Sequence, residues 1–80
     1  FNPTTTISFA VSEVGHVSVG IYDITGRLVS NLVDQNMHPG SYDVTWDGTD
    51  LSGAHVSAGM YIYSLQAEGV SLTRKMVLMK

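Results

Sequence analysis

The chain has 80 residues, a formal net charge of −3 and 44% hydrophobic residues. This length allows one small domain, expected to span residues 1–80, and the hydrophobic content is typical of a folded chain and excludes a disordered one. The four cationic residues form no run before the C-terminus, so neither nucleic acid nor an anionic membrane surface is an expected partner.

Cysteine usage and the ends of the chain add little. No cysteine is present, which fits either a reducing compartment or a core that suffices without disulfides. No apolar run approaches the roughly 18 residues of a membrane-spanning helix, so membrane insertion is not expected. No signal peptide opens the chain, which begins at Phe1 instead of methionine, and we therefore expect a segment excised from the end of a longer secreted protein.

The first half of the chain reads as strands joined by turns. Strands are predicted at 4–11 and 17–23, where β-branched and aromatic residues alternate with polar ones, and the segment 12–16 forms the turn between them. The residues predicted to face inward are Ile7, Phe9, Val11, Val17, Val19 and Ile21, whereas Ser18 and Gly20 face away.

A third strand is predicted at 27–34, after a short hairpin connection in which Gly26 takes a positive φ. Its apolar residues come in pairs, at 28–29 and 32–33, which indicates a bulge or a twisted edge strand. A short helix also fits this spacing, but the glycine turn before it and Pro39-Gly40 after it favour a strand. The segment 35–40 is predicted to be the next turn.

The centre of the chain, residues 42–63, reads as strand, long turn, strand. Trp46 ends the first of these strands, and we expect its ring to fill the core because it is the largest apolar group available. The turn itself contains Asp47, Gly48, Asp50 and Gly53, which are residues that favour turns. A calcium loop is a weaker interpretation, because the sixth and twelfth positions counted from Asp47 are Ser52 and Ala58 instead of glycine and glutamate.

A last hairpin turns at 67–69 and leads into a final strand at 70–79, with Leu72, Met76 and Leu78 inward. Short strands about ten residues apart, separated by turn signals, predict an all-β fold: a sandwich of six or seven antiparallel strands.

Catalytic and metal-binding patterns are not found. His16, His38 and His55 all fall in predicted turns and include no close pair that could start a zinc site. There is no cysteine, no nucleophile elbow and little room for a cleft, so no enzyme activity and no cofactor are expected. Trp46, Tyr61 and Tyr63 could suggest a carbohydrate-stacking face, but their alternation is that of core positions.

Several motifs resemble a known family when they are taken together. They include the opening Asn2-Pro3, Tyr22-Asp23 followed by Gly26-Arg27, the turn Trp46-Asp47-Gly48 with Asp50, the segment Gly53 to Gly59-x-Tyr61, and the closing residues Lys75 to Lys80. This combination resembles the C-terminal sorting domain of type IX secretion cargo, which is related to the immunoglobulin-like domain of flagellar hook-capping proteins. The closing residues favour the sorting domain, because such chains end at this strand.

The resemblance implies an immunoglobulin-like sandwich that directs a cargo of Bacteroidota-like bacteria to the cell surface or the medium. Its implied partners are an outer-membrane translocon and a surface sortase. Carried over by position, the implied recognition residues are Asp23, Gly26, Arg27, Gly59, Tyr61, Lys75, Met76 and Lys80.

Two alternatives remain open at this stage. A sandwich with few charges and open edge strands could self-associate into an extracellular filament or tube, and the end of the last strand carries apolar residues on both faces. An accessory module of an extracellular enzyme, which would bind polysaccharide, is the other alternative.

Overall fold

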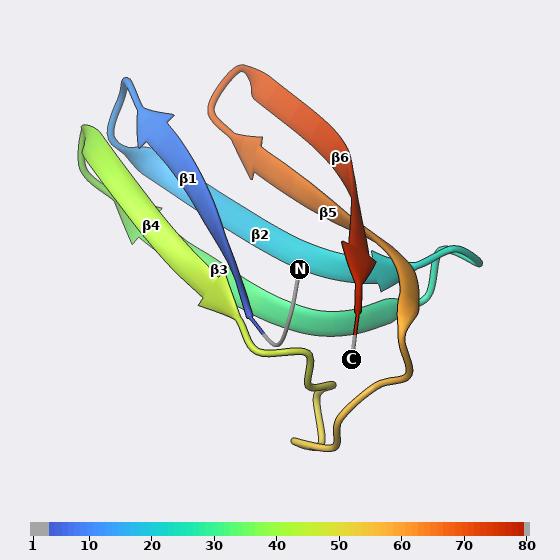
Figure 1. Ribbon diagram of the computed structural model, residues 1–80. Coiled ribbons are helices and arrows are strands. Elements are labelled where there is room, and N and C mark those ends of the chain that lie inside the picture. The colour runs from blue at the N-terminus through green and yellow to red at the C-terminus, as the bar shows by residue number, and fades with distance from the viewer. Residues whose placement is uncertain (1–3, 80) are drawn as a thin grey trace.

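A computed structural model describes residues 4–79 of the chain, and all regular structure in that range is β-strand (Figure 1). None of it is a helix of the length and apolarity needed to cross a membrane. The strands are β1 (Thr5–Val11), β2 (Gly15–Asp23), β3 (Leu28–Met37), β4 (Gly40–Trp46), β5 (Gly59–Ala67) and β6 (Val70–Leu78).

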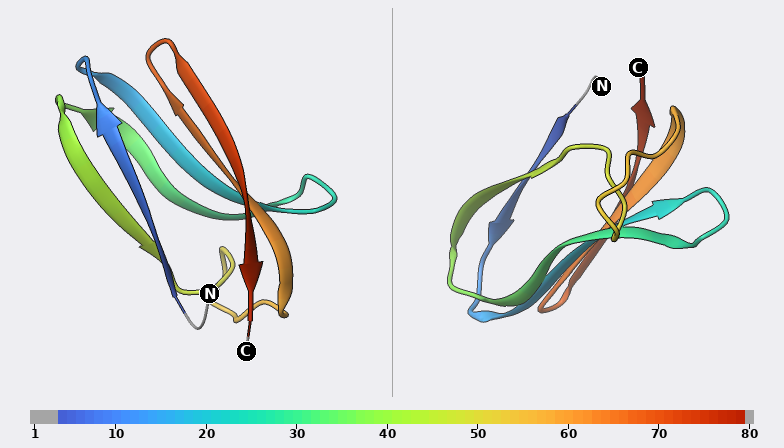
Figure 2. Two further views of the ribbon diagram at one scale, coloured as in Figure 1. Left: turned by 45° about the horizontal axis from the view of Figure 1, so that its top comes forward. Right: turned by 90° about the horizontal axis from the view of Figure 1, so that it is seen from below.

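The strands form two antiparallel sheets, one with the order β1-β4 and one with the order β3-β2-β5-β6. Figure 2 shows them as two layers that meet where β1 turns into β2 and β3 turns into β4. The third crossing between the sheets is the long connection 47–58 from β4 to β5. The predicted all-β sandwich of six antiparallel strands is confirmed.

The core lies between the two sheets and is apolar throughout. Trp46 has 1% of its surface exposed, so the prediction that its ring fills the core is confirmed. Its ring meets the ring of Tyr61 edge to face, with centroids 5.2 Å apart. The other buried hydrophobic residues are Ile7, Val11, Val17, Val19, Ile21, Val33, Met37, Leu65 and Leu78.

The third strand is longer than the sequence predicts. The predicted turn at 35–40 is wrong, because β3 continues to Met37 and only residues 38–39 separate it from β4. Met37 is buried and pairs with Gly15. The longer β3 therefore makes further pairs with the start of β2 and adds one more side chain to the core. For the same reason His16 lies in β2 and not in a turn, where it opposes Asn36. The predicted bulge is confirmed, since the β2–β3 register shifts at two places.

Gly20 is the other difference. The sequence places it on the outer face, yet it is buried, because the ring of Tyr22 folds back over it. A Cβ at position 20 would lie 3.1 Å from a ring carbon of Tyr22. The Tyr22 side chain thus covers a glycine of its own strand on the outer face of the sheet.

Candidate binding groove

Two turns at one end of the molecule share a sequence pattern. Asp23-Ile24-Thr25-Gly26 connects β2 to β3, and Asp50-Leu51-Ser52-Gly53 lies in the connection from β4 to β5. Each pattern is aspartate, an aliphatic residue, a hydroxyl residue and glycine. The repetition predicts the same local backbone twice.

The backbone of the two turns agrees with this. Gly26 and Gly53 both have φ of 87°, which confirms the positive φ predicted for Gly26. The N–H of each glycine donates to the carbonyl of the aspartate three residues earlier, at 3.0 Å in both turns. The aspartate N–H in turn donates to the carbonyl four residues later, on Arg27 at 3.0 Å and on Ala54 at 2.9 Å.

The aspartate carboxylates hold the turns closed. Oδ1 of Asp23 accepts hydrogen bonds from the Thr25 N–H at 2.9 Å, the Thr25 hydroxyl at 2.5 Å and the Arg27 N–H at 3.1 Å. Oδ1 of Asp50 accepts in the same way from the Ser52 N–H at 2.9 Å, the Ser52 hydroxyl at 2.7 Å and the Ala54 N–H at 3.1 Å. Three donors on one oxygen favour the ionised form.

This bonding lowers the pKa of both carboxyl groups below their ordinary value of 3.8. The largest cause for Asp23 is the Thr25 hydroxyl, followed by the Arg27 N–H. For Asp50 the largest cause is the Ser52 hydroxyl, followed by the Ala54 N–H. Both side chains therefore stay charged at lower pH than an unbonded aspartate does.

A third aspartate fixes the path from β4 into this connection. Asp47 accepts from the Thr49 N–H at 3.1 Å and from the Thr49 hydroxyl at 2.5 Å, and the hydroxyl is the main reason its pKa is lowered. The Trp46 indole N–H donates to the Thr49 carbonyl at 2.9 Å. Thr49 also forms an isolated bridge with His55, so the buried ring and the exposed loop are tied together.

The two matching turns border an open groove with a volume of about 360 Å³. Its lining combines apolar residues with five charged or titratable side chains. The lining residues are Asp23, Arg27, Leu28, Val29, Asp50, His55, Val56, Ser57 and Tyr61. The Tyr61 hydroxyl donates to the Ser57 carbonyl at 2.6 Å, which anchors the start of β5 to the groove wall.

Three polar side chains of the groove hydrogen-bond to nearby backbone groups: those of Asp23, Asp50 and Tyr61. Each aspartate directs one oxygen into its own turn, so these carboxylates are committed to backbone structure. Across residues 4–79, no three His, Cys, Asp or Glu side chains come together in a way that could hold a metal ion. The apolar members of the two turns point outward instead, with Ile24 70% and Leu51 66% exposed.

The residues implied by the sorting-domain resemblance divide into two groups in space. Asp23, Arg27 and Tyr61 line the groove, and Gly26 lies in the turn beside it. Gly59 begins β5 with a φ of 150°.

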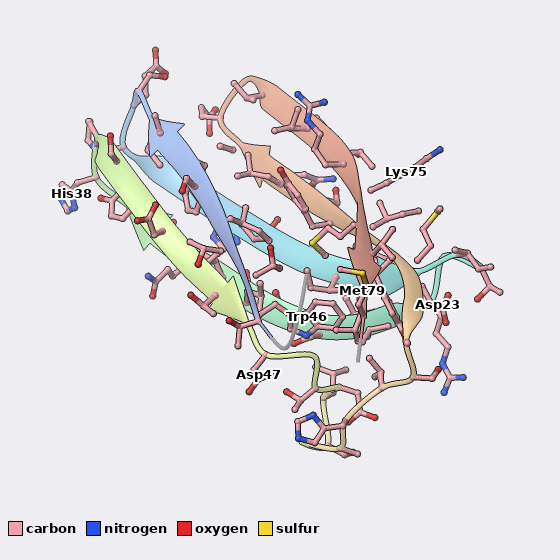
Figure 3. All side chains as sticks on the ribbon, in the orientation of Figure 1. Asp23, His38, Trp46, Asp47, Lys75 and Met79 are labelled. Carbon is pink, nitrogen blue, oxygen red and sulfur yellow. The ribbon has the colours of Figure 1, made fainter. Side chains whose placement is uncertain are left out.

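The remaining implied residues lie on the last strand. Lys75 and Met76 are neighbours on β6 and face opposite sides of the sheet, with Lys75 directed away from the core (Figure 3). Lys80 lies outside the described residues.

Sequence reasoning missed what joins the groove together. Asp50 and Gly53 were predicted only as turn residues, and His55 only as a loop residue, yet Asp50 and His55 face the same groove as Arg27. The signal that could have found this was the repeated pattern of aspartate, aliphatic, hydroxyl residue and glycine. His38 lies at the opposite end of the molecule (Figure 3).

Two facing antiparallel sheets, closed over one tryptophan and edged by aspartate-held turns, define a small immunoglobulin-like module. A family model described as the FlgD Ig-like domain matches residues 1–71. The chain therefore belongs to the FlgD Ig-like domain family.

Among solved structures, the chain is similar to FlgD from P. aeruginosa, with 25% sequence identity and a TM-score of 0.64. The match covers 94% of this chain and 59% of that chain, so the segment corresponds to somewhat more than half of the FlgD structure. A comparison with curated proteins found no match.

These findings correct the functional prediction. Of the two related families that the sequence resembled, the hook-capping immunoglobulin-like domain is supported and the type IX sorting domain is not. The predicted sorting function, its translocon and sortase partners, and the predicted route across the outer membrane to the cell surface are therefore wrong.

The physical reason for the error lies in what the shared motifs do. Trp46 fills the core, Asp47 and Asp23 close turns, and Gly26 supplies a positive φ. Their roles here are in folding, so they do not by themselves indicate what the domain is used for. The closing residues from Lys75 onward, which favoured the sorting domain, lie beyond the matched range 1–71.

Proposed function

We propose that this chain is a structural, non-catalytic immunoglobulin-like module of a protein that takes part in flagellar hook assembly. The match of the FlgD Ig-like domain model to residues 1–71 carries the proposal. The likeness to FlgD from P. aeruginosa, at a TM-score of 0.64, supports it. In this role the module is part of a longer, exported protein whose partners are other components of the growing hook.

The local chemistry supports a structural role. The acidic side chains that line the groove hold turns, with three donors on one oxygen of Asp23 and three on one oxygen of Asp50. A carboxylate used in this way keeps a low pKa and is poorly suited to act as a general base near neutral pH. The exposed aliphatic tips of the same turns are suited to contact another protein.

The proposal is tested in a flagellated strain that carries the parent gene. Residues 1–80 are deleted, or are replaced by a flexible linker, and hooks are counted by electron microscopy beside a motility assay. We expect hooks to be lost or misshapen while the rest of the protein is still made and exported. Normal hooks on cells that contain the shortened protein would contradict the proposal.

A point variant separates folding from contact. Ile24→Ser removes an apolar tip that is 70% exposed and leaves the hydrogen bonds of the turn in place. Ser8→Ala, at an exposed position of β1 away from both turns, serves as the control. We expect the first to impair hook assembly without loss of folded protein and the second to have no effect.

A further inference from the structure

The outer face of the four-stranded sheet carries an exposed apolar patch at the end where β5 begins. Strand pairing places Leu28, Tyr22, Ile62 and Lys75 in one row across β3, β2, β5 and β6. Met60 and Val77 form the next pair on the same face. We call this set of six residues the outer patch.

The apolar residues of the outer patch are exposed together and are not scattered singly over the surface. Leu28, Met60 and Val77 are 42%, 46% and 50% exposed, and Met60 and Val77 are direct partners on neighbouring strands. Contiguous apolar surface of this kind marks contact with another molecule. Lys75, a member of the patch, is also exposed and gives the patch a positive charge.

The acidic residue that ends β2, Asp23, has its carboxylate engaged within its own turn, where Oδ1 accepts from the Thr25 N–H, the Thr25 hydroxyl and the Arg27 N–H. The six residues of the outer patch include no aspartate or glutamate, so Lys75 is the charged group of the patch.

The opposite end of the molecule carries a surface whose charge is opposite to that of the outer patch. Two turns meet there, since a Cβ at Gly15 would lie 3.3 Å from a carboxylate oxygen of Glu68. These turns carry two acidic and two exposed aliphatic residues. We call this set the acidic tip, and its members are Glu13, Val14, Glu68 and Val70.

The acidic tip contains no cation of its own, because residues 12–14 and 67–70 include neither lysine nor arginine. Val14 and Val70 are 62% and 53% exposed, so the tip combines apolar surface with negative charge. The molecule is elongated, 36 Å by 22 Å by 21 Å. Because the strands run from one end to the other, the tip and the patch of a single copy cannot touch (Figure 1).

We propose that the outer patch binds the acidic tip of a second copy of this chain, with Lys75 facing Glu68. Apolar surface is covered on both sides, and opposite charges meet within it. The contact joins two different surfaces, so it is head to tail and builds a ring or an open row of copies. This inference rests on the proposed structural role of the module, and it identifies the surfaces through which the module would carry out that role.

Charge reversal tests this contact on the 80-residue chain. Lys75→Glu and Glu68→Lys each place like charges in the contact, and each is expected to weaken self-association by about five- to tenfold. Self-association is measured by sedimentation equilibrium at low salt, from about 10 μM to 2 mM protein, because a small contact is expected to be weak. Circular dichroism verifies that each variant is folded.

Matched controls separate the contact from net charge. Arg74→Glu changes the net charge from −3 to −5 (−3 − 2), as Lys75→Glu does, but Arg74 lies on the other face of β6. Asp43→Lys changes it from −3 to −1 (−3 + 2), as Glu68→Lys does, on an exposed position of β4. Both controls should leave the association constant within about twofold of the unchanged chain.

The decisive arm is a mixture. Alone, Lys75→Glu and Glu68→Lys should each show the weakened association, whereas an equimolar mixture should regain the association of the unchanged chain, because each tip then meets a patch of opposite charge on the other variant. A wild-type chain that is monomeric throughout the range, controls that weaken association as much as the contact variants, or a mixture without recovery would overturn this inference. None of these results bears on the hook counts, which test the proposed function separately.

Discussion

Replacing Trp46 by phenylalanine tests how the core and the long connection depend on one residue. The indole is 1% exposed, and its N–H donates to the Thr49 carbonyl at 2.9 Å. The smaller ring leaves about 40 Å² of apolar surface unburied, which costs about 1 kcal/mol. The lost hydrogen bond costs about 1 kcal/mol more.

We therefore expect Trp46→Phe to lower the free energy of unfolding by about 2 kcal/mol. A chain of this size is stable by only about 4–12 kcal/mol, so the change is a large fraction of the total. The melting temperature should fall by roughly 8–16 °C.

Urea unfolding followed by far-ultraviolet circular dichroism measures this, since tryptophan fluorescence is lost in the variant. Ser41→Ala, at an exposed position of β4, is the control and should change stability by less than about 0.5 kcal/mol. A loss below about 1 kcal/mol for Trp46→Phe, with an unchanged denaturant slope, would refute the role given to this ring.

Three further results are expected. Gly26→Ala should destabilise the fold by about 1–2 kcal/mol, because φ is 87° while a Cβ there would meet nothing within 4 Å; Gly26→Asn should recover part of the loss in the same urea titration. Ile21→Val, at a position with no exposed surface, should cost about 1 kcal/mol in thermal unfolding, and no measurable loss would contradict its place in the core. Because the folded-state pKa values of Asp23 and Asp50 are lowered, the stability they provide is complete above about pH 4 and is lost as pH falls below 3.8 through the folded-state values. Unfolding measured from pH 6 to pH 2 should show this loss, and the loss should be smaller in Asp50→Asn. The same pH dependence in Asp50→Asn as in the unchanged chain would contradict the role given to this carboxylate in closing the turn.

The strands were predictable where one face is buried and the other is exposed to solvent. Alternation identified Val17, Val19 and Ile21 as core residues, and the size of Trp46 identified the centre. The order of strands was not readable, because β1 pairs with β4 across 28 intervening residues and no local signal fixes such a pairing.

Two local errors show where sequence reasoning failed. Gln35–Asn36 are polar and exposed, so nothing in their composition shows that the strand continues to a buried Met37. Gly20 looked like an outward residue, yet Tyr22 covers it in a contact within the same strand. In both cases a tertiary or neighbouring contact overrode the local pattern.

The function was harder to predict than the fold for a related reason. Most of the residues that carried the resemblance build turns and core, so they do not distinguish between domains with different uses. The groove residues could have been grouped from the repeated turn pattern, because Asp50-Leu51-Ser52-Gly53 copies the chemistry of 23–26. The outer patch needed strand order, since its members come from four strands.

The central claim is that this module acts by contact within a growing flagellar hook. It is tested most directly by placing a photo-crosslinking amino acid at Ile24, an exposed turn tip, in the full-length parent protein of a flagellated strain. The account predicts light-dependent crosslinks to another copy of the protein or to hook components while hooks are being built. Crosslinks only to proteins outside the flagellum, in cells that assemble hooks normally, would contradict it.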